Sequence, residues 1–324
     1  MQSLEFYREE FTEYLGKKIV SKKPENLYDP VVYIMGLGGK RLRPILTLMA
    51  ADLFGGDHKK AMDAAMAIEV FHNFSLVHDD IMDDAPLRRG QPTVHEKWNV
   101  NTGILSGDAM LISAYQCLEG YEGDTFKALL NLFSKTAIEV CEGQQYDIDF
   151  ETRNDVAIGE YLKMIEYKTA VLIAAALKMG AIVASAPDEE QELIYEFGRN
   201  LGIAFQLQDD YLDAFGNPET FGKQVGGDII ENKKTFLYIE AYRHASEADR
   251  KTLVDLYALQ PEDPTEKVQK AKAIFERSGA VNAIKRKIEN YTEIAFESLA
   301  KIKADEENKK VFEDFGNNLM QRTF

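Results

Sequence analysis

The chain has 324 residues, an apolar fraction of 45% and a formal net charge of −16 at pH 7. A chain of this length can bury a sizeable core, and the apolar fraction is ordinary for a globular protein. The negative charge argues against nucleic acid or an anionic membrane as the main partner. If the ligand is itself an anion, a cation must mediate its binding.

Cysteine usage and the N-terminal sequence indicate a reducing compartment. Cys117 and Cys141 have no metal-ligand spacing and suggest no disulfide framework. Residues 1–20 carry charges throughout and contain no apolar signal-peptide segment. No apolar run reaches the roughly 18 residues that a membrane helix needs. We therefore expect a cytoplasmic protein without an integral membrane segment.

The first segment with a chemical signal is GGKRLRP, residues 38–44. Two glycines precede Lys40, Arg41 and Arg43, and Pro44 lies at an expected helix start. Glycines permit close approach of the backbone, and arginine side chains suit phosphate oxygens. Taken alone, the segment is as consistent with a basic helix cap as with an anion site.

Residues 60–84 have helical periodicity. Ala64, Ile68, Phe71 and Ser75 recur at spacings of three and four, which predicts one buried helix face. The same segment ends in four aspartates, and Arg88, Arg89 and Gly90 follow closely.

The aspartates form the first of two acidic motifs. On a helix, Asp79 and Asp83 share one face, while Asp80 is offset by about 100°. Like charges at this spacing destabilise a helix unless something offsets them. A single copy is equally consistent with a solvated acidic face. For His78, beside Asp79, we prefer a packing or hydrogen-bonding histidine over a general base.

Residues 160–184 have apolar side chains on most faces and predict a largely enclosed helix. Lys168 lies within it, where a lysine is costly without a partner. Residues 188–215 follow Pro187 and open with acids, which predicts a helix start. This helix carries the second acidic motif, Asp209, Asp210 and Asp213.

Residues 216–235 form a long predicted loop with four glycines and three lysines. Loops of this length are usually functional or disordered, so a flexible surface connection is the alternative. Elsewhere strand signals are scarce, and all nine prolines, Pro30 among them, are compatible with helix starts or loops. We expect an all-α protein with a single domain over residues 1–324.

Because the acidic motif occurs twice, a metal site becomes a better interpretation of both copies than a solvated acidic face. Both lie within apolar helix sequence, where uncompensated carboxylates are costly. Two facing carboxylate clusters without zinc-type His or Cys spacing favour a hard cation such as Mg²⁺. Magnesium binds through a few carboxylates together with substrate phosphates, which indicates a diphosphate ligand. Two separate basic sets indicate two anionic groups.

With these motifs in view, the sequence resembles the trans-isoprenyl diphosphate synthases of the polyprenyl synthetase family. The resemblance covers nearly the whole chain. It rests on GGKRLRP, DDIMDDAPLRRG, GQQYD, YKTA, FQLQDDYLD and GKQVGGDIIENKKT, in the family's order. It implies a bundle of long helices around a central active-site cavity (the isoprenoid synthase type), a homodimer, and a prenyltransferase that joins isopentenyl diphosphate to an allylic diphosphate.

The resemblance also implies residue roles. Three Mg²⁺ ions on the allylic diphosphate would be held by Asp79, Asp80, Asp83, Asp209 and Asp210, with Asp213 a hydrogen-bond partner. That diphosphate would be contacted by Arg88, Lys168, Lys223 and Lys233. The diphosphate of isopentenyl diphosphate would be bound by Lys40, Arg43, His72 and Arg89. Thr169 and Gln206 would direct oxygen dipoles at the allylic cation, and Arg322 is a loose match to a late basic residue. No side chain is assigned as the base, because the released diphosphate is expected to take the proton.

Product length is expected to depend on Phe74 and Ser75. Phe74 lies five residues before Asp79, a little over one helical turn away. In the family a bulky ring there forms a floor below the growing chain, and Ser75 leaves the adjacent position open. Together with the absence of an insertion in DDIMD, this favours a twenty-carbon product, with a fifteen-carbon product next. An ordinary core aromatic is the alternative for Phe74.

Three other functions fit part of the sequence. A class I terpene cyclase has a different second motif and does not need GGKRLRP. A di-iron bundle would use Glu69 and His72 as Glu-x-x-His but lacks the second such motif. A non-catalytic subunit of a heteromeric synthase usually loses aspartates, and both acidic motifs are intact here.

Overall fold

The computed structural model describes residues 1–153, 155–216 and 226–320. Helices make up almost all of the regular structure in these residues, so the all-α prediction is confirmed. The chain divides into two compact units. The first contains residues 1–137, 175–195 and 303–308, and the second contains residues 138–174, 196–302 and 309–324. One domain over the whole chain stays a prediction.

The first unit is built on the N-terminal helices, and the pairing of its strands is limited to one short hairpin. Its elements are α1 (Leu4–Lys18), α2 (Glu25–Gly36), α3 (Leu42–Leu53), the 3-10 turn η1 (His58–Ala61), α4 (Met62–Met82), β1 (Leu87–Arg88), β2 (Gln91–Pro92), α5 (Val94–Lys97) and α6 (Val100–Gln116).

The second unit carries the elements that follow. They are α8 (Ile158–Ile165), the π-helical turn η2 (Glu166–Ala170), α12 (Gly227–Ile230), α13 (Phe236–His244), α14 (Glu247–Leu256), α15 (Thr265–Arg277) and α16 (Ala280–Lys301). The chain passes from one unit to the other within α7 (Gly123–Thr152), α9 (Val171–Val183), α10 (Asp188–Phe215) and α17 (Glu306–Met320), and also between residues 302 and 303 after α16. Among the described residues, every helix is too short or too polar to span a bilayer.

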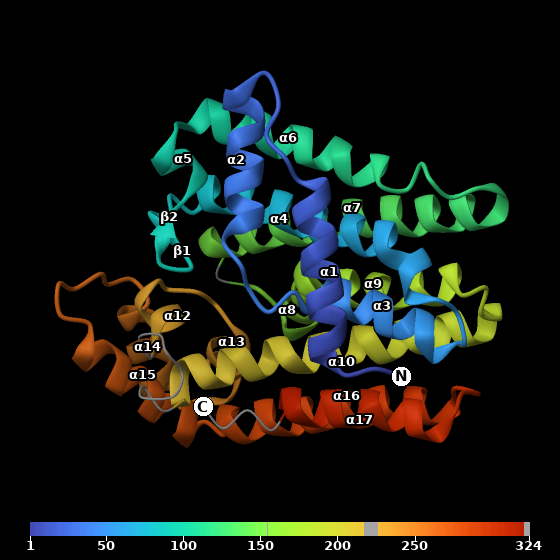
Figure 1. Cartoon of the computed structure of the whole chain (residues 1–324). Coiled ribbons are helices and arrows are strands. Elements are labelled where there is room, and N and C mark those ends of the chain that lie inside the picture. The colour runs from blue at the N-terminus through green and yellow to red at the C-terminus, as the bar shows by residue number, and fades with distance from the viewer. Residues whose placement is uncertain (154, 217–225, 321–324) are drawn as a thin grey trace. The chain divides into compact units, whose positions relative to one another are not determined.

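Helix α4 is the central element of the first unit. It packs along α6 and against α3, and α2 also packs on α6 (Figure 1). Ala64, Ile68 and Phe71 are buried as their spacing predicts, while Ser75 is half-buried. The ring of Phe71 packs edge-on against Phe133, with 5.4 Å between centroids. This packing fixes the direction of α4 and therefore the position of the acidic motif at its end.

The predicted helix over residues 160–184 is interrupted. A π-helical turn, η2, separates α8 from α9, so Lys168 and Thr169 lie on a local widening of the helix rather than on a regular turn. Single π turns occur frequently at functional sites. A Cβ added at Gly143 of α7 would lie 2.2 Å from the backbone nitrogen of Lys168, so the helices approach here only because residue 143 is glycine.

Two further predictions about helices have different outcomes. The helix expected over residues 188–215 is confirmed, since α10 has these same bounds. The prediction that every proline lies at a helix start or in a loop is wrong for Pro30. It lies inside α2, six residues into the helix. At that position the proline ring is buried and removes one backbone hydrogen bond of the helix.

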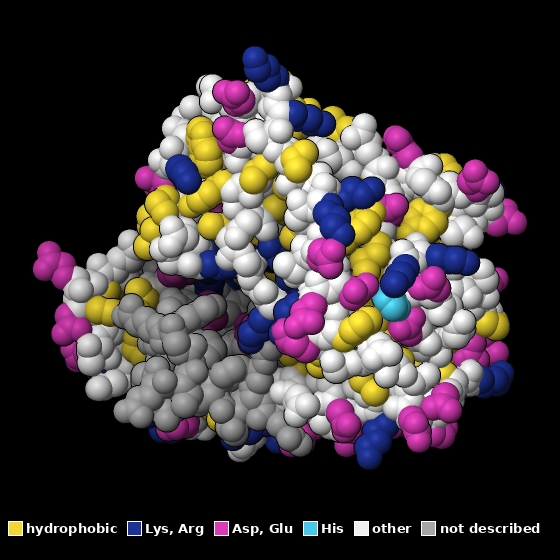
Figure 2. Space-filling model, in the orientation of Figure 1, with side chains coloured by type: hydrophobic (Ala, Val, Ile, Leu, Met, Phe, Trp, Pro, Cys, Tyr) yellow, Lys and Arg dark blue, Asp and Glu magenta, His cyan; other side chains and the backbone are white. Residues whose placement is uncertain are grey.

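The surface of the first unit is mixed. Apolar side chains lie among charged ones over α1, α2 and α5 (Figure 2). On α6 four large apolar residues are exposed: Val100, Ile104, Leu105 and Ile112. At 100° per residue they occupy one broad face of the helix.

Candidate functional site

The first unit contains a cluster of basic groups around His72. Arg43 lies on α3, and its Nη1 is 3.1 Å from Nε2 of His72 on α4. Desolvation, and then the charge of Arg43, lowers the pKa of His72 well below its usual value. The charges of Arg89, Arg88 and Arg41 act in the same direction. A neutral imidazole surrounded by guanidinium groups is an environment that attracts an anion.

Arg43 is incompletely satisfied within the described residues. Its Nε is buried and has no hydrogen-bond partner there. Desolvation lowers its pKa, and the charge of Glu69 only partly opposes this effect. Glu69 itself is buried in an ion pair with Arg41 and also accepts from Asn73. It is therefore committed to a structural contact, which argues further against a di-iron role for Glu69 and His72.

The two glycines of GGKRLRP bring the backbone against Arg89. The carbonyl of Gly38 accepts a hydrogen bond from Arg89 Nη1. Gly39 has φ of +115°, and a Cβ there would lie 2.7 Å from the Arg89 guanidinium. Desolvation and the nearby charge of Arg41 lower the pKa of Arg89. The glycines therefore allow the backbone to approach Arg89 closely, while an approach to a phosphate stays a prediction. Lys40, in the same segment, is exposed.

The first acidic motif contains one deeply buried carboxylate. Asp80 is 1% exposed, and Nε and Nη2 of Arg88 donate to both of its oxygens at 2.7–2.9 Å. Asp79 is half-buried on α4, and Asp83 is exposed at the C-cap of that helix. Arg88 therefore offsets the charge repulsion within the motif and holds β1 to the end of α4.

The residues before this motif pack closely together. Phe74 is 8% exposed and lies between Phe71 and His78, at centroid distances of 5.5 and 4.8 Å. His78 Nε2 is 3.2 Å from the carbonyl of Ile104 on α6. These contacts are those of a packing histidine. Ser75 donates to the carbonyl of His72 at 2.8 Å.

The second unit contains a cavity lined by five of the predicted site residues: Lys168, Thr169, Gln206, Asp210 and Lys233. They come from the π turn η2, from α10 and from the segment after α12. Other lining residues are Asp147, Tyr161 and Asp228. Basic, acidic and dipolar side chains from distant parts of the sequence therefore share one cavity.

A chain of hydrogen bonds connects these residues. Thr169 Oγ1 donates to Gln206 Oε1 at 3.3 Å, and Gln206 makes a side-chain hydrogen bond with Asp210. The buried hydroxyl of Tyr161 also donates to Asp210 Oδ2. Burial, followed by the charge of Asp228, raises the pKa of Asp210 well above its usual value, although the two hydrogen bonds oppose the shift. The two hydrogen bonds orient the Asp210 carboxylate, but they do not offset the destabilisation of its charged form by burial and by Asp228.

Three cavity residues had no assigned role in the sequence interpretation. Asp147 forms an ion pair with Lys168 at 2.5 Å, so the costly half-buried lysine has its partner. Asp228 and Tyr161 surround Asp210. Asp147 ends GQQYD and Asp228 lies in GKQVGGDII, both segments of the resemblance. These two segments could therefore have pointed to Asp147 and Asp228, whereas nothing in the sequence singles out Tyr161.

Asp209 and Asp213, the other acids of the second motif, lie on α10, which also carries Gln206 and Asp210 of the cavity. Asp209 is half-buried on α10. Asp213 accepts from the backbone nitrogen of Asp228 at 3.0 Å, and its expected role beside the metal ligands stays a prediction. Lys233 pairs with Glu231 at 2.7 Å. Lys223 and Arg322 lie outside the described residues, as does much of the predicted loop over residues 216–235.

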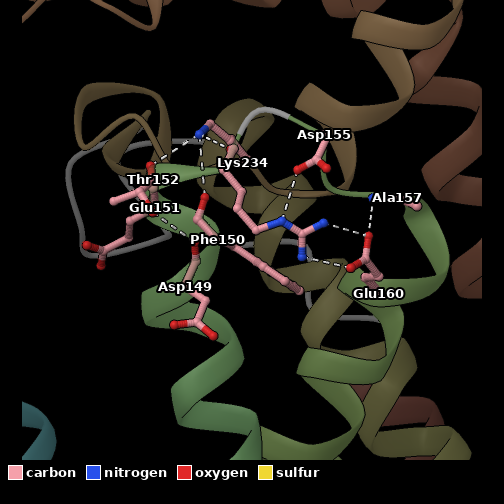
Figure 3. Close-up of polar contacts among 9 residues, drawn as sticks. Asp149, Phe150, Glu151, Thr152, Asp155, Ala157, Glu160 and Lys234 are labelled. Atoms are coloured by element: carbon pink, nitrogen blue, oxygen red, sulfur yellow. Dashed lines mark hydrogen bonds and ion pairs between the residues drawn. The ribbon is translucent and has the colours of Figure 1, made fainter.

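Lys234 makes different contacts from its neighbour Lys233. Its Nζ donates to the carbonyls of Phe150 and Glu151 in the last turn of α7 and to that of Arg153 just after the helix (Figure 3). Carbonyls of the last helical turn have no partner within the helix, and a lysine favours this end of the helix dipole. Arg153 in turn pairs with Asp155 and Glu160. Lys234 thus fixes the chain after α12 to the end of α7.

Asp228 should make stability depend on pH. Burial, and then the charge of Asp213, raises its pKa to about 7, against about 3.9 in an unfolded chain. The folded chain therefore keeps a proton that the unfolded chain loses, and the resulting stabilisation disappears as pH rises from about 4 through 7. We expect Asp228→Asn to flatten the decline in the unfolding free energy of the metal-free protein. Urea unfolding of both proteins at several pH values between about 4 and 7 measures the unfolding free energy and tests this expectation.

The exposed Asp255 on α14 provides the matched control. Asp255→Asn should keep the wild-type pH dependence. If Asp228→Asn kept it too, Asp228 would not be the titrating group.

The acidic residues fit a hard divalent cation. Both motifs offer carboxylate oxygens only, which is the donor set that Mg²⁺ prefers. In the second unit, the raised pKa of Asp210 shows a carboxylate that a bound cation would stabilise in its charged form.

Comparisons with known proteins agree with this chemistry. The model of the Polyprenyl synthetase family matches residues 24–275. A geranylgeranyl diphosphate synthase of Methanosarcina mazei is 44% identical over 229 residues, covering 70% of this chain and 71% of the relative. A geranylfarnesyl diphosphate synthase of Natronomonas pharaonis is 34% identical over 336 residues, covering 98% and 96%. A crystal structure of a geranylgeranyl pyrophosphate synthase, 53% identical, has a TM-score of 0.95 and covers 100% of both chains.

Proposed function

The chain belongs to the polyprenyl synthetase family, and on that premise we propose that it condenses isopentenyl diphosphate head-to-tail with an allylic diphosphate in a magnesium-dependent reaction. It is a transferase of the isoprenyl diphosphate synthase type. The observation that carries the proposal is the cavity of the second unit, where Lys168, Thr169 and Gln206 accompany Asp210. It supplies charge for a diphosphate and dipoles for a cation.

The allylic substrate would use this cavity. Lys168 and Lys233 would bind its diphosphate, and the Asp147 pair would hold the Lys168 amine ready. As the carbon–oxygen bond breaks, these cations stabilise the departing negative charge. The hydroxyl of Thr169 donates to Gln206, so the hydroxyl oxygen can face the positive charge that develops on the allylic carbon.

Magnesium would be held by Asp79, Asp80 and Asp83 in the first unit and by Asp209 and Asp210 in the second, with three ions expected. When bound, the metal supplies charge stabilisation for the leaving diphosphate. Tyr161 and Gln206 keep the Asp210 carboxylate oriented for this purpose.

Isopentenyl diphosphate would bind in the basic cluster of the first unit, through Lys40, Arg43, His72 and Arg89. The Nε of Arg43, which has no hydrogen-bond partner among the described residues, supports this assignment. The lowered pKa of His72 keeps its ring neutral, so the ring can accept from Arg43 without adding repulsion. The released diphosphate is the base that we propose for the final proton loss.

Phe74→Ala should lengthen the product. If Phe74 forms the floor of the chain-elongation space, removing its ring leaves room for further five-carbon units. The relatives include makers of geranylgeranyl and of longer geranylfarnesyl diphosphate. We propose a twenty-carbon product for the wild type, with fifteen carbons next, and a longer one for the variant, measured by chromatography of the dephosphorylated products.

Phe71→Leu is the control, because Phe71 is also a buried aromatic on α4 and packs against Phe74. It should leave product length unchanged. An unchanged length in Phe74→Ala would show that Phe74 is an ordinary core residue.

The exposed apolar face of α6 supports a homodimer. Leu105 and Ile112 are 60% and 61% exposed, and they lie seven residues apart on the same face. Clustered exposed apolar residues mark interaction surfaces. We expect Leu105→Glu combined with Ile112→Glu to give a monomer in sedimentation analysis. Val254→Glu, at an exposed position of α14, should not. A monomeric wild type would contradict the proposal.

A cytoplasmic location stays a prediction.

A product assay tests the proposed function. Isopentenyl diphosphate would be supplied separately with dimethylallyl, geranyl and farnesyl diphosphate. Prenyl diphosphates longer than the primer would establish the reaction, and their length would identify the product. Absence of product from every primer would instead favour a subunit that needs a partner.

A further inference from the structure

Among the described residues, no hydrogen-bond partner is found for a buried histidine after the β1–β2 hairpin. The side chain of His95 on α5 is 5% exposed, and neither ring nitrogen makes a hydrogen bond in the part of the chain that the structure describes. Buried polar atoms without partners are uncommon, because their desolvation is not repaid. The ring therefore needs a partner that binds an imidazole nitrogen.

Two carboxylates lie beside this ring. One ligand atom each from Asp84, His95 and Glu96 lies within 4.8 Å of the other two. His95 Nε2 is 3.8 Å from Glu96 Oε1, which is too far for a hydrogen bond but close to the spacing of two ligands on one ion. Ligands at ordinary zinc distances in a tetrahedron are about 3.4 Å apart. Asp84 and Glu96 are exposed, so small side-chain rotations can close the set.

We propose that Asp84, His95 and Glu96 bind a divalent transition-metal ion such as Zn²⁺. One imidazole and two carboxylates suit Zn²⁺, whereas Mg²⁺ prefers oxygen ligands throughout. The site is thus chemically different from the two acidic motifs, which offer carboxylates alone. This inference does not rest on the proposed function.

The ion would add a further contact between the end of α4 and α5, which hydrogen bonds already connect. Thr93 donates through Oγ1 to the carbonyl of Ala85 at 2.8 Å, and through its backbone nitrogen to Pro86 at 3.1 Å. Arg88 pairs with Asp80. A cation bound by Asp84 and by the two α5 residues joins the end of α4 to α5 across the hairpin that carries Arg88 and Arg89. Binding should therefore raise the melting temperature.

Zinc titration of the full chain in an excess of Mg²⁺ tests the site, because the excess competes for the all-carboxylate motifs. We expect one calorimetric Zn²⁺ binding event that His95→Gln weakens by at least about 10-fold. His78→Gln is the matched control, since His78 adjoins Asp79. It should leave the Zn²⁺ affinity unchanged. Asp84→Asn should weaken binding like His95→Gln, and this exposed substitution cannot disturb the core.

A spectroscopic readout identifies the ligand directly. With Cu²⁺ as the probe, electron spin echo modulation should show an imidazole nitrogen in the wild type and in His78→Gln, and not in His95→Gln. The proposal is overturned if Zn²⁺ does not bind in excess Mg²⁺. It is also overturned if Asp84→Asn binds Zn²⁺ as tightly as the wild type. If His95→Gln fails to fold, Asp84→Asn and Glu96→Gln decide the question.

Discussion

Asp210→Asn is expected to remove most of the activity while making the metal-free protein more stable. Burial and the charge of Asp228 both disfavour the Asp210 carboxylate. An amide removes the charge and keeps an oxygen that accepts from Tyr161. Without divalent ions at mildly alkaline pH, the melting temperature should rise, on the order of 2 °C. The kcat should fall about 10²- to 10³-fold, because a preorganised charge for the transition state is lost.

The opposite signs of the two effects separate function from packing. Calorimetric melting and a steady-state product assay measure them. Asp255→Asn, at an exposed position of α14, should change neither quantity. If Asp210→Asn lowered stability and activity together, Asp210 would be a structural residue.

Gly143→Ala should damage both the stability and the activity. Its Cβ would lie 2.2 Å from the backbone nitrogen and 2.7 Å from the Cα of Lys168. Backbone atoms cannot rotate away, so α7 and the π turn must separate. Overpacking of this kind costs about 1–3 kcal/mol, occasionally more. Displacing Lys168 and Thr169 by about 1 Å should lower kcat about 10²-fold.

Gly159 on α8 offers a matched control, since nothing lies within 4 Å of a Cβ added there and the residue is exposed. Gly159→Ala should leave activity unchanged. Gly202→Ala on α10 should behave like Gly143→Ala, because its Cβ would lie 2.8 Å from the Cα of Ala170. A Gly143→Ala protein with wild-type melting and kcat would contradict the importance of the π turn.

Local signals explain why much of the helical structure was predictable. Pro187 and the following acids mark the start of α10, and apolar spacing identified the buried face of α4. The cavity residues Lys168, Thr169, Gln206 and Asp210 were also anticipated, because the resemblance includes their motifs. Patterns within one helix or one motif are visible without knowledge of the fold.

Features that depend on contacts between distant residues were not predictable. The π turn η2 forms where Gly143 of α7 meets Lys168, twenty-five positions along the chain. Tyr161 binds Asp210 through a hydrogen bond that no spacing rule suggests. Arg88 was expected to contact a diphosphate, which stays a prediction, whereas the structure shows it paired with Asp80. These pairings require the packed structure.

The most direct test of the central claim is prenyl product formation, with and without Mg²⁺, by the wild type, Asp79→Ala and Asp209→Ala. We expect wild-type product only with Mg²⁺ and loss of activity with a chelator. We expect about a 10³-fold loss of activity in each variant, since several kcal/mol of charge stabilisation disappear, and unchanged circular dichroism. Product formation in chelator, full activity in either variant, or an unfolded variant would show that the two acidic motifs do not act as proposed.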